Sequence, residues 1–255
     1  MELSMKSEDE IVDDISFEKA IDIARTFAEE IAALYPDTLA VYAIGSIGGG
    51  YYRPGQSDID TVVIMNCTRA QANDRITAVE AVADRYWKEY NVPKGFGAIV
   101  MGKEQLMPPY IPEEELVMEI IRLKAQNLLV YGNFDIDSVP MPDKQAIIDA
   151  ENAFEDWRAA EGNMPPEKMT RQMTVNSILI LLKRWLLLEK GIIEFNKFNV
   201  VGEYLKNEPP YLKEKYLNAV DGYLHGRKIP DSLLLEMSLW HEQLLKDMNK
   251  DLLGR

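Results

Sequence analysis

The sequence changes character near residue 140, and this change constrains the fold more than any other feature. Before it, apolar runs typical of strands alternate with segments of helical periodicity. A polar connector with two prolines, residues 133–144, follows, and every later segment has the pattern of a helix. We therefore predict an α/β domain over residues 1–140, with a small mixed sheet and flanking helices, and an all-α helical bundle over residues 141–255.

The individual elements follow from local periodicity and from proline and glycine positions. In the first domain the pattern predicts strands at 39–45, 59–65 and 96–101, helices at 16–34, 68–90 and 112–131, and a glycine-rich loop at 46–56. In the second domain it predicts helices at 143–161, 165–190, 198–207, 209–225 and 231–252.

The chain is acidic, with 28 basic and 42 acidic residues and a net charge of −14. Most of this excess lies in residues 1–150, which hold 26 acidic and 13 basic side chains. Because nucleic-acid binding depends on neutralisation of phosphates by Lys and Arg, we expect no nucleic acid as a partner. The charge is compatible with solubility alone, and also with a site for metal ions or a cationic partner.

Other sequence features exclude several protein classes. The single cysteine, Cys67, excludes a disulfide framework and a cysteine-rich metal site. No apolar run approaches the roughly 18 residues of a membrane span. The N-terminus is acidic and lacks the basic-then-apolar layout of a signal peptide, so we expect a cytoplasmic protein without membrane contact.

The most informative segment joins the first two predicted strands. Gly45-Ser46 ends the first strand, and Ser57-Asp58-Ile59-Asp60 begins the second. Because side chains alternate along a strand, Asp58 and Asp60 point to the same face. Two carboxylates suit Mg²⁺, which commonly binds one or two carboxylates together with substrate phosphates. Backbone N–H groups and the serine hydroxyl at the strand end can bind phosphate.

Each of these features alone has a simpler explanation, because an Asp-x-Asp pair is usually solvated and a Gly-Ser is usually a turn. Their order is specific, however: apolar strand, Gly-Ser, short loop, Ser-Asp-x-Asp, apolar strand. This arrangement resembles the polymerase-β-like nucleotidyltransferases. The resemblance implies that Asp58 and Asp60 are catalytic ligands of Mg²⁺, that Gly45, Ser46 and Ser57 contact the triphosphate of ATP, and that pyrophosphate is released.

Residues beyond this signature resemble the aminoglycoside adenylyltransferases of the streptomycin/spectinomycin type, an antibiotic-resistance class. The similar segments are a predicted leucine-rich helix end at 128–132, the long helix, glycine and basic loop of 176–205, and AVDGYLHG at 219–226. The resemblance implies transfer of AMP to a hydroxyl of a small, cationic acceptor. It also implies that Lys183, Lys197 and Tyr223 bind the nucleotide, with Arg184 as an alternative to Lys183.

The third predicted strand departs from the family pattern. It contains no acid where the related enzymes have a glutamate that acts as general base, and Glu104, just past the strand, is the nearest candidate. Two alternatives therefore stay open: a nucleotide-binding regulatory protein without catalysis, and an enzyme that modifies a protein. For the main prediction and for both alternatives we expect a monomer or a small homo-oligomer.

Overall fold

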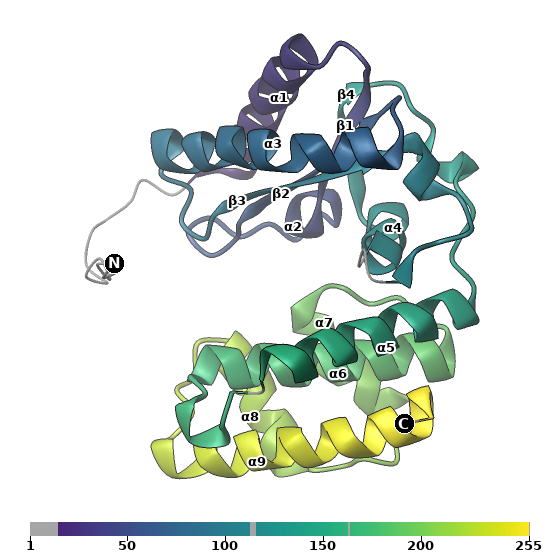
Figure 1. Cartoon of the computed structure of the whole chain (residues 1–255). Coiled ribbons are helices and arrows are strands. Elements are labelled where there is room, and N and C mark those ends of the chain that lie inside the picture. The colour runs from purple at the N-terminus through teal and green to yellow at the C-terminus, as the bar shows by residue number, and fades with distance from the viewer. Residues whose placement is uncertain (1–14, 113–115, 163, 255) are drawn as a thin grey trace. The chain divides into compact units, whose positions relative to one another are not determined.

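The computed structural model describes residues 15–112, 116–162 and 164–254 (Figure 1). Its contacts divide the chain into two compact units, each described here by itself. The first comprises Met1–Pro108 and Ile120–Met141, and the second Pro109–Glu119 and Pro142–Arg255. The predicted domain boundary at 140/141 stays a prediction, and the contacts in addition group residues 109–119 with the helical unit.

The first unit is built on a four-stranded sheet with the order β3-β2-β1-β4. Strand β2 pairs in parallel with β3, whereas β1 pairs antiparallel with both β2 and β4. The predicted mixed sheet is therefore confirmed. The strands are β1 (Thr38–Ile44), β2 (Ile59–Met65), β3 (Phe96–Gly102) and β4 (Asn127–Gly132).

Strand β4 corrects the sequence prediction of a helix over 112–131. Helix α4 (Leu116–Ala125) ends early, and the run Leu128-Leu129-Val130-Tyr131 forms β4 against β1 instead. A short apolar run has no period that separates a strand from a buried helix, so pairing with β1 decides the outcome. The predicted helix start involves residues 113–115, which lie outside the described part of the chain.

Two long helices cover one face of this sheet: α1 (Phe17–Leu34) and α3 (Arg69–Tyr90) (Figure 1). Ser16 and Thr68 cap them by accepting hydrogen bonds from backbone N–H groups of the first turn. The apolar core between these helices and the sheet includes Ile59 and Val63 of β2. Asp60, between them, points to the opposite face, as strand alternation requires.

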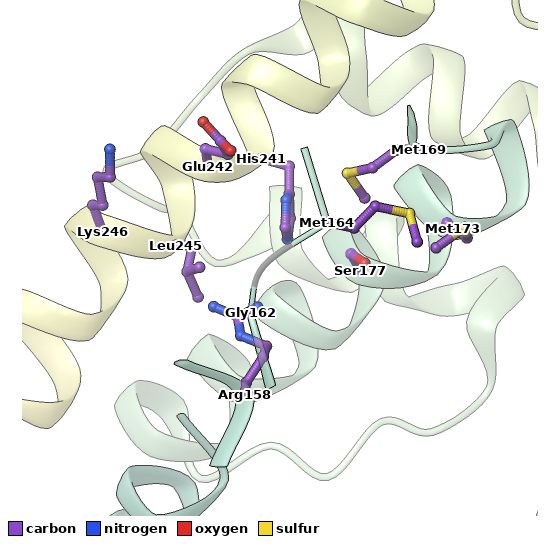
Figure 2. A pocket seen from close by; sticks show the side chains of 10 residues that line it. All are labelled: Arg158, Gly162, Met164, Met169, Met173, Ser177, His241, Glu242, Leu245 and Lys246. Carbon is purple, nitrogen blue, oxygen red and sulfur yellow. The ribbon is translucent and has the colours of Figure 1, made fainter. Parts of the chain in front are cut away.

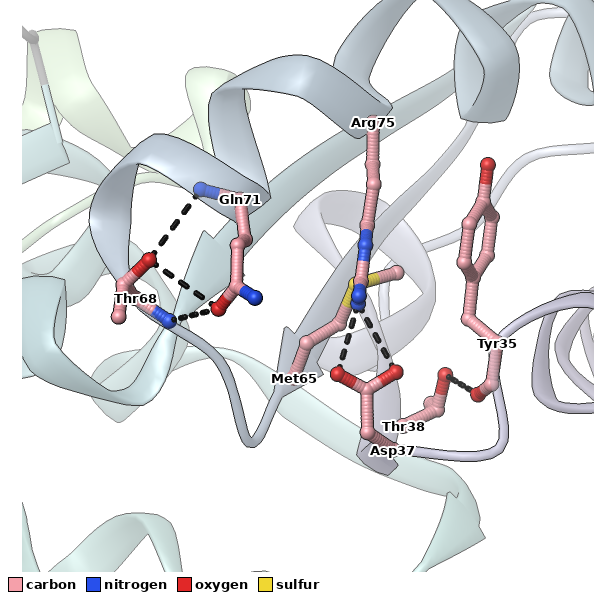
Figure 3. Close-up of polar contacts among 7 residues, drawn as sticks. All are labelled: Tyr35, Asp37, Thr38, Met65, Thr68, Gln71 and Arg75. Carbon is pink, nitrogen blue, oxygen red and sulfur yellow. Dashed lines mark hydrogen bonds and ion pairs between the residues drawn. The ribbon is translucent and has the colours of Figure 1, made fainter.

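The end of β1 and β2 away from Asp60 is fixed by polar contacts (Figure 3). Arg75 Nη1 donates to both carboxylate oxygens of Asp37 at 2.8 Å. Thr68 and Gln71 form a capping box at the start of α3. The Asp37–Arg75 ion pair thus lies in the same unit as Asp60, at the opposite end of β1 and β2.

The second unit is helical, which confirms the predicted all-α bundle. Its helices are α5 (Lys144–Glu161), α6 (Arg171–Lys190), α7 (Lys197–Lys206), α8 (Glu214–Leu224) and α9 (Asp231–Met248), followed by a π-helical turn, Asn249–Leu253. Helix α8 begins at Glu214, five residues later than the predicted start at 209. Among the described residues, no helix is long and apolar enough to cross a bilayer.

Candidate active site

The antiparallel register of β1 and β2 brings the two halves of the predicted signature together. Ile44 pairs with Asp60, so Gly45 and Ser46 follow directly at the sheet edge where Asp60 lies. The predicted loop begins as a short helical turn, α2 (Gly45–Gly48). Gly45 has a φ of +61°, and a Cβ there would lie 3.1 Å from Asp60 Oδ2. Glycine is thus required at position 45 both by its backbone conformation and by this close approach.

Asp60 sits between an arginine and a glycine. Its Oδ2 accepts a hydrogen bond of 2.6 Å from Arg122 Nη2. A Cβ on Gly97, its neighbour on β3, would lie 2.9 Å from Oδ1. Burial and the negative charge of Asp58 raise the pKa of Asp60, while Arg122 lowers it. Arg122 therefore compensates the negative charge of Asp60 only in part.

Sequence reasoning missed Arg122. It lies on α4, 62 residues from Asp60, and no local spacing connects the two residues. The connection depends on β4, because Asn127 pairs with Ile44 and so returns the end of α4 to the Asp60 edge of the sheet. The predicted helix over 112–131 included the residues of β4, so the sequence did not indicate that Arg122 lies beside Asp60.

The two serines of the signature differ in their surroundings. Ser46 Oγ is buried and has no hydrogen-bond partner among the described residues. Buried hydroxyls are normally satisfied, so this group is suited to donate to a ligand oxygen. Ser57 Oγ instead accepts a hydrogen bond of 3.0 Å from the Arg53 N–H and closes a turn. Asp58 precedes β2 and is exposed.

Glu104 does not join this site. In the parallel pair of β2 and β3, Asp60 is opposite Gly97 and Met65 is opposite Gly102, so Glu104 lies beyond the far end of the strands. Five strand residues span about 16 Å. Glu104 Oε2 instead accepts from the Arg69 N–H at the start of α3, at 3.3 Å. The register therefore places Glu104 away from Asp60, and its role as general base stays a prediction.

The donor set fits a metal ion that is held jointly with a nucleotide. Among the described residues there is no group of three or more His, Cys, Asp or Glu side chains arranged for a metal. At the β3 position beside Asp60 stands Gly97, where even a Cβ is crowded. Two carboxylates with phosphate oxygens are a common Mg²⁺ environment, so Asp58 and Asp60 suit Mg²⁺ bound together with a triphosphate.

The remaining predicted nucleotide contacts lie in the helical unit, and their roles stay predictions. Lys183 on α6 and Lys197 at the start of α7 are partly exposed, with Nζ 6.0 Å from the Phe195 ring and 5.4 Å from the Phe198 ring. Tyr223 on α8 is also partly exposed.

Arg184, the alternative to Lys183, serves a different purpose. It is only 2% exposed and forms ion pairs with Glu151 and Glu155 of α5. It also donates to Asn249 Oδ1 at 2.9 Å. This network holds Arg184 inside the bundle, so its side chain is not exposed for contact with a nucleotide.

Comparison with known families agrees with this geometry. Residues 24–101, which contain both halves of the signature, match the family model described as nucleotidyltransferase domain. The first unit is therefore similar to a nucleotidyltransferase domain over residues 24–101. A sequence comparison with curated proteins gives no significant match.

The fold of the chain is also similar to a solved two-substrate complex. That protein is the spectinomycin adenyltransferase AAD(9) from Enterococcus faecialis, whose crystal structure contains ATP and spectinomycin. The TM-score is 0.55 at 19% identity, over 90% of this chain and 99% of that chain. The resemblance to aminoglycoside adenylyltransferases is thus confirmed at the level of the fold.

Proposed function

We propose that this protein transfers AMP from ATP to a hydroxyl group of a small, cationic acceptor, such as an aminoglycoside, and releases pyrophosphate. The observation that carries the proposal is the Ile44–Asp60 register, which places the partnerless hydroxyl of Ser46 and the carboxylate of Asp60 at one sheet edge. A phosphate-binding group and a metal-binding group are thereby adjacent, as nucleotidyl transfer requires.

In this reaction the acceptor hydroxyl oxygen forms a bond to the α-phosphorus, the bond from that phosphorus to the β-phosphate oxygen breaks as pyrophosphate leaves, and the hydroxyl proton passes to water. Mg²⁺, held by Asp58 and Asp60, supplies neutralisation of the phosphate charge when it is bound. Gly45 permits close approach of the backbone to the phosphates, and Ser46 donates a hydrogen bond to them. Ser57 shapes the adjacent turn through its contact with Arg53, and its proposed nucleotide contact uses the remaining hydroxyl proton.

We also propose that three side chains of the helical unit contact the triphosphate: Lys183, Lys197 and Tyr223. The preference for a cationic acceptor is supported by the acidic first half of the chain. The AAD(9) structure with spectinomycin supports a small acceptor that carries hydroxyl groups.

The direct test measures pyrophosphate release from MgATP with a panel of aminoglycosides and aminocyclitols. We expect release with at least one acceptor and its loss in Asp60→Asn. The matched control is Asp37→Asn, which removes a carboxylate paired with Arg75 at the opposite sheet edge and should retain activity. Mass spectrometry of the acceptor should show the addition of one AMP. Activity that persists in correctly folded Asp60→Asn contradicts the mechanism.

One observation favours a second function, nucleotide binding without catalysis. Gly97 occupies the β3 position beside Asp60, so this strand supplies no third carboxylate there. For such a protein, calorimetry would show binding of MgATP while no small acceptor and no purified protein acceptor elicits pyrophosphate release. Release with any acceptor excludes this function, and a protein acceptor would identify a protein-modifying enzyme.

A further inference from the structure

Three consecutive glycines, Gly48 to Gly50, follow Ser46 almost directly and leave this segment without side chains that could fix it. Glycine has more conformational freedom than any other residue, so a segment of this kind needs contacts from elsewhere to hold one conformation. Those contacts come from Tyr51, directly after the glycines, and from Gln126, between α4 and β4. All of these residues belong to the first unit.

The glycine backbone packs closely against Gln126. A Cβ at Gly48 would lie 2.6 Å from the carbonyl oxygen of Gln126 and 2.7 Å from that of Ala43. A Cβ at Gly49 would lie 3.0 Å from Gln126 Nε2 and would overlap the Tyr51 ring. The same lack of side chains that makes this segment flexible therefore also permits its packing against Gln126 and Tyr51.

Tyr51 closes the turn through two hydrogen bonds. Its backbone N–H donates to the Ser46 carbonyl oxygen at 2.9 Å, and its phenolic O–H donates to Gln126 Oε1 at 3.2 Å. The N–H groups of Gly49 and Gly50 donate to carbonyl oxygens within the turn itself. The Tyr51 hydroxyl thus links the turn to another element, and Gln126 is only 8% exposed, so this bond is shielded from water.

Gln126 is joined in turn to the carboxylate side of the site. Its backbone N–H donates to the Arg122 carbonyl oxygen at 2.8 Å, which extends the last turn of α4. The Arg122 side chain donates to Asp60 Oδ2. The end of α4 is therefore connected to Ser46 through Tyr51 and to Asp60 through Arg122.

We propose that Gln126 and Tyr51 are positioning residues that hold Ser46 in the conformation that receives the triphosphate. This inference rests on the proposed nucleotidyl transfer, and both residues act through Ser46 without touching the phosphates. Without the Tyr51–Gln126 bond the glycine segment populates further conformations, and nucleotide binding must then order it at a cost in affinity. Because Ser46 contacts the phosphates before and during the reaction, the loss should raise KM for ATP with little change in kcat.

Calorimetric titration of the full chain with MgATP tests the proposal. Tyr51→Phe keeps the aromatic ring but removes the hydroxyl, and Gln126→Met keeps the length of the side chain but removes the acceptor. Each should weaken MgATP binding about three- to tenfold, the value of one hydrogen bond. The double variant should bind MgATP no more weakly than either single variant, because all three lack the same bond.

The dependence on Ser46 separates positioning from a purely structural role. In a Ser46→Ala background, Tyr51→Phe should weaken MgATP binding by less than about twofold, because the hydroxyl that it positions is already absent. A purely structural role would lower the free energy of unfolding equally in both backgrounds and leave the affinity for MgATP unchanged.

Two further variants are matched controls. Tyr42→Phe removes a hydroxyl that donates to the Phe134 carbonyl oxygen in the same unit. Ser177→Ala removes a hydroxyl from α6, where Ser177 lines a cavity of the helical unit (Figure 2). Both variants should keep the MgATP affinity of the unaltered protein.

The outcomes distinguish this inference from the proposed function. Unchanged MgATP affinity in folded Tyr51→Phe and Gln126→Met overturns the inference, and so does an equal loss of affinity in Tyr42→Phe. MgATP binding without pyrophosphate release for any acceptor contradicts the proposed function alone, because the dependence of affinity on Tyr51 and Ser46 is still measured. A lack of MgATP binding by the unaltered protein overturns both.

Discussion

Arg122 Nη2 lies 2.6 Å from Asp60 Oδ2, so a helix that follows the third strand supplies the counter-charge for a carboxylate at the start of the second. Both side chains are about one-quarter exposed, at 26% and 24%. A Cβ at Gly45 would lie 2.7 Å from the same guanidinium nitrogen. The pair is therefore closely enclosed, and any cation that binds Asp60 must compete with Arg122 or share the carboxylate with it.

Replacement of Arg122 tests that competition. In Arg122→Met, we expect Mn²⁺, used as a paramagnetic substitute for Mg²⁺, to bind several-fold more tightly in the absence of nucleotide, because one cation at Asp60 is removed. The free energy of unfolding should fall by about 1–2 kcal/mol, since a partly buried carboxylate loses its partner. Electron paramagnetic resonance titration and urea denaturation measure the two effects. Weaker Mn²⁺ binding would instead show that Arg122 holds Asp60 in a metal-binding geometry.

The space around Asp60 predicts a contrast between two glycine-to-alanine variants. In Gly97→Ala the new methyl group would lie 2.9 Å from Asp60 Oδ1 and should displace the carboxylate, lowering the rate of AMP transfer at least tenfold. Gly202 lies inside α7, where an added Cβ meets nothing within 4 Å. Gly202→Ala should stabilise the protein by about 0.5–1 kcal/mol without loss of activity. Equal activity in both variants would contradict a role for the Asp60 position.

Lys183 and Arg184 are neighbours in sequence but should respond to substitution in opposite ways. Arg184→Met leaves Glu151 and Glu155 buried without their shared cation and should destabilise the protein by about 3–5 kcal/mol in urea denaturation. Lys183→Met should change stability by less than about 0.5 kcal/mol. Calorimetry of Lys183→Met should show about tenfold weaker ATP binding, if its ammonium contacts phosphate. Full ATP affinity in that variant excludes the contact.

His241 should make stability depend on pH. Burial lowers its pKa to about 4 in the folded protein, whereas the pKa is near 6.5 when unfolded, so the unfolded chain binds the extra proton between these values. The contribution of His241 to the free energy of unfolding is thus fully present above about pH 6.5 and declines as the pH falls toward 4. The loss over this window is roughly 2–4 kcal/mol.

The matched variants for this effect are His241→Phe and His225→Phe. His225 is exposed, and its replacement serves as the control for the loss of a histidine. His241→Phe should reduce the slope between pH 6.5 and 4, measured by urea denaturation at several pH values. An identical slope in both variants would show that other groups, such as paired carboxylates, govern the acid sensitivity.

Local patterns in the sequence were sufficient to predict most elements of the first unit. They also predicted the two parts of the site, Gly45-Ser46 and Asp60. Strand β2 (Ile59–Met65) has the predicted bounds, and the alternation that separates Asp60 from Ile59 and Thr61 is a property of any strand. The order of Gly45-Ser46 and Asp60 likewise depends on two consecutive strands joined by a short connection, an arrangement that sequence can indicate.

The remaining features depended on contacts between distant residues, and only the tertiary structure decided them. Strand β4 exists because β1 offers a pairing edge, and that pairing brings Arg122 to Asp60. The parallel register of β2 and β3 separates Glu104 from the site. Burial against Glu151 and Glu155 distinguishes Arg184 from Lys183. Periodicity reports which way a side chain points on its own element, whereas strand register and the choice of ion-pair partner are set by which elements pack together.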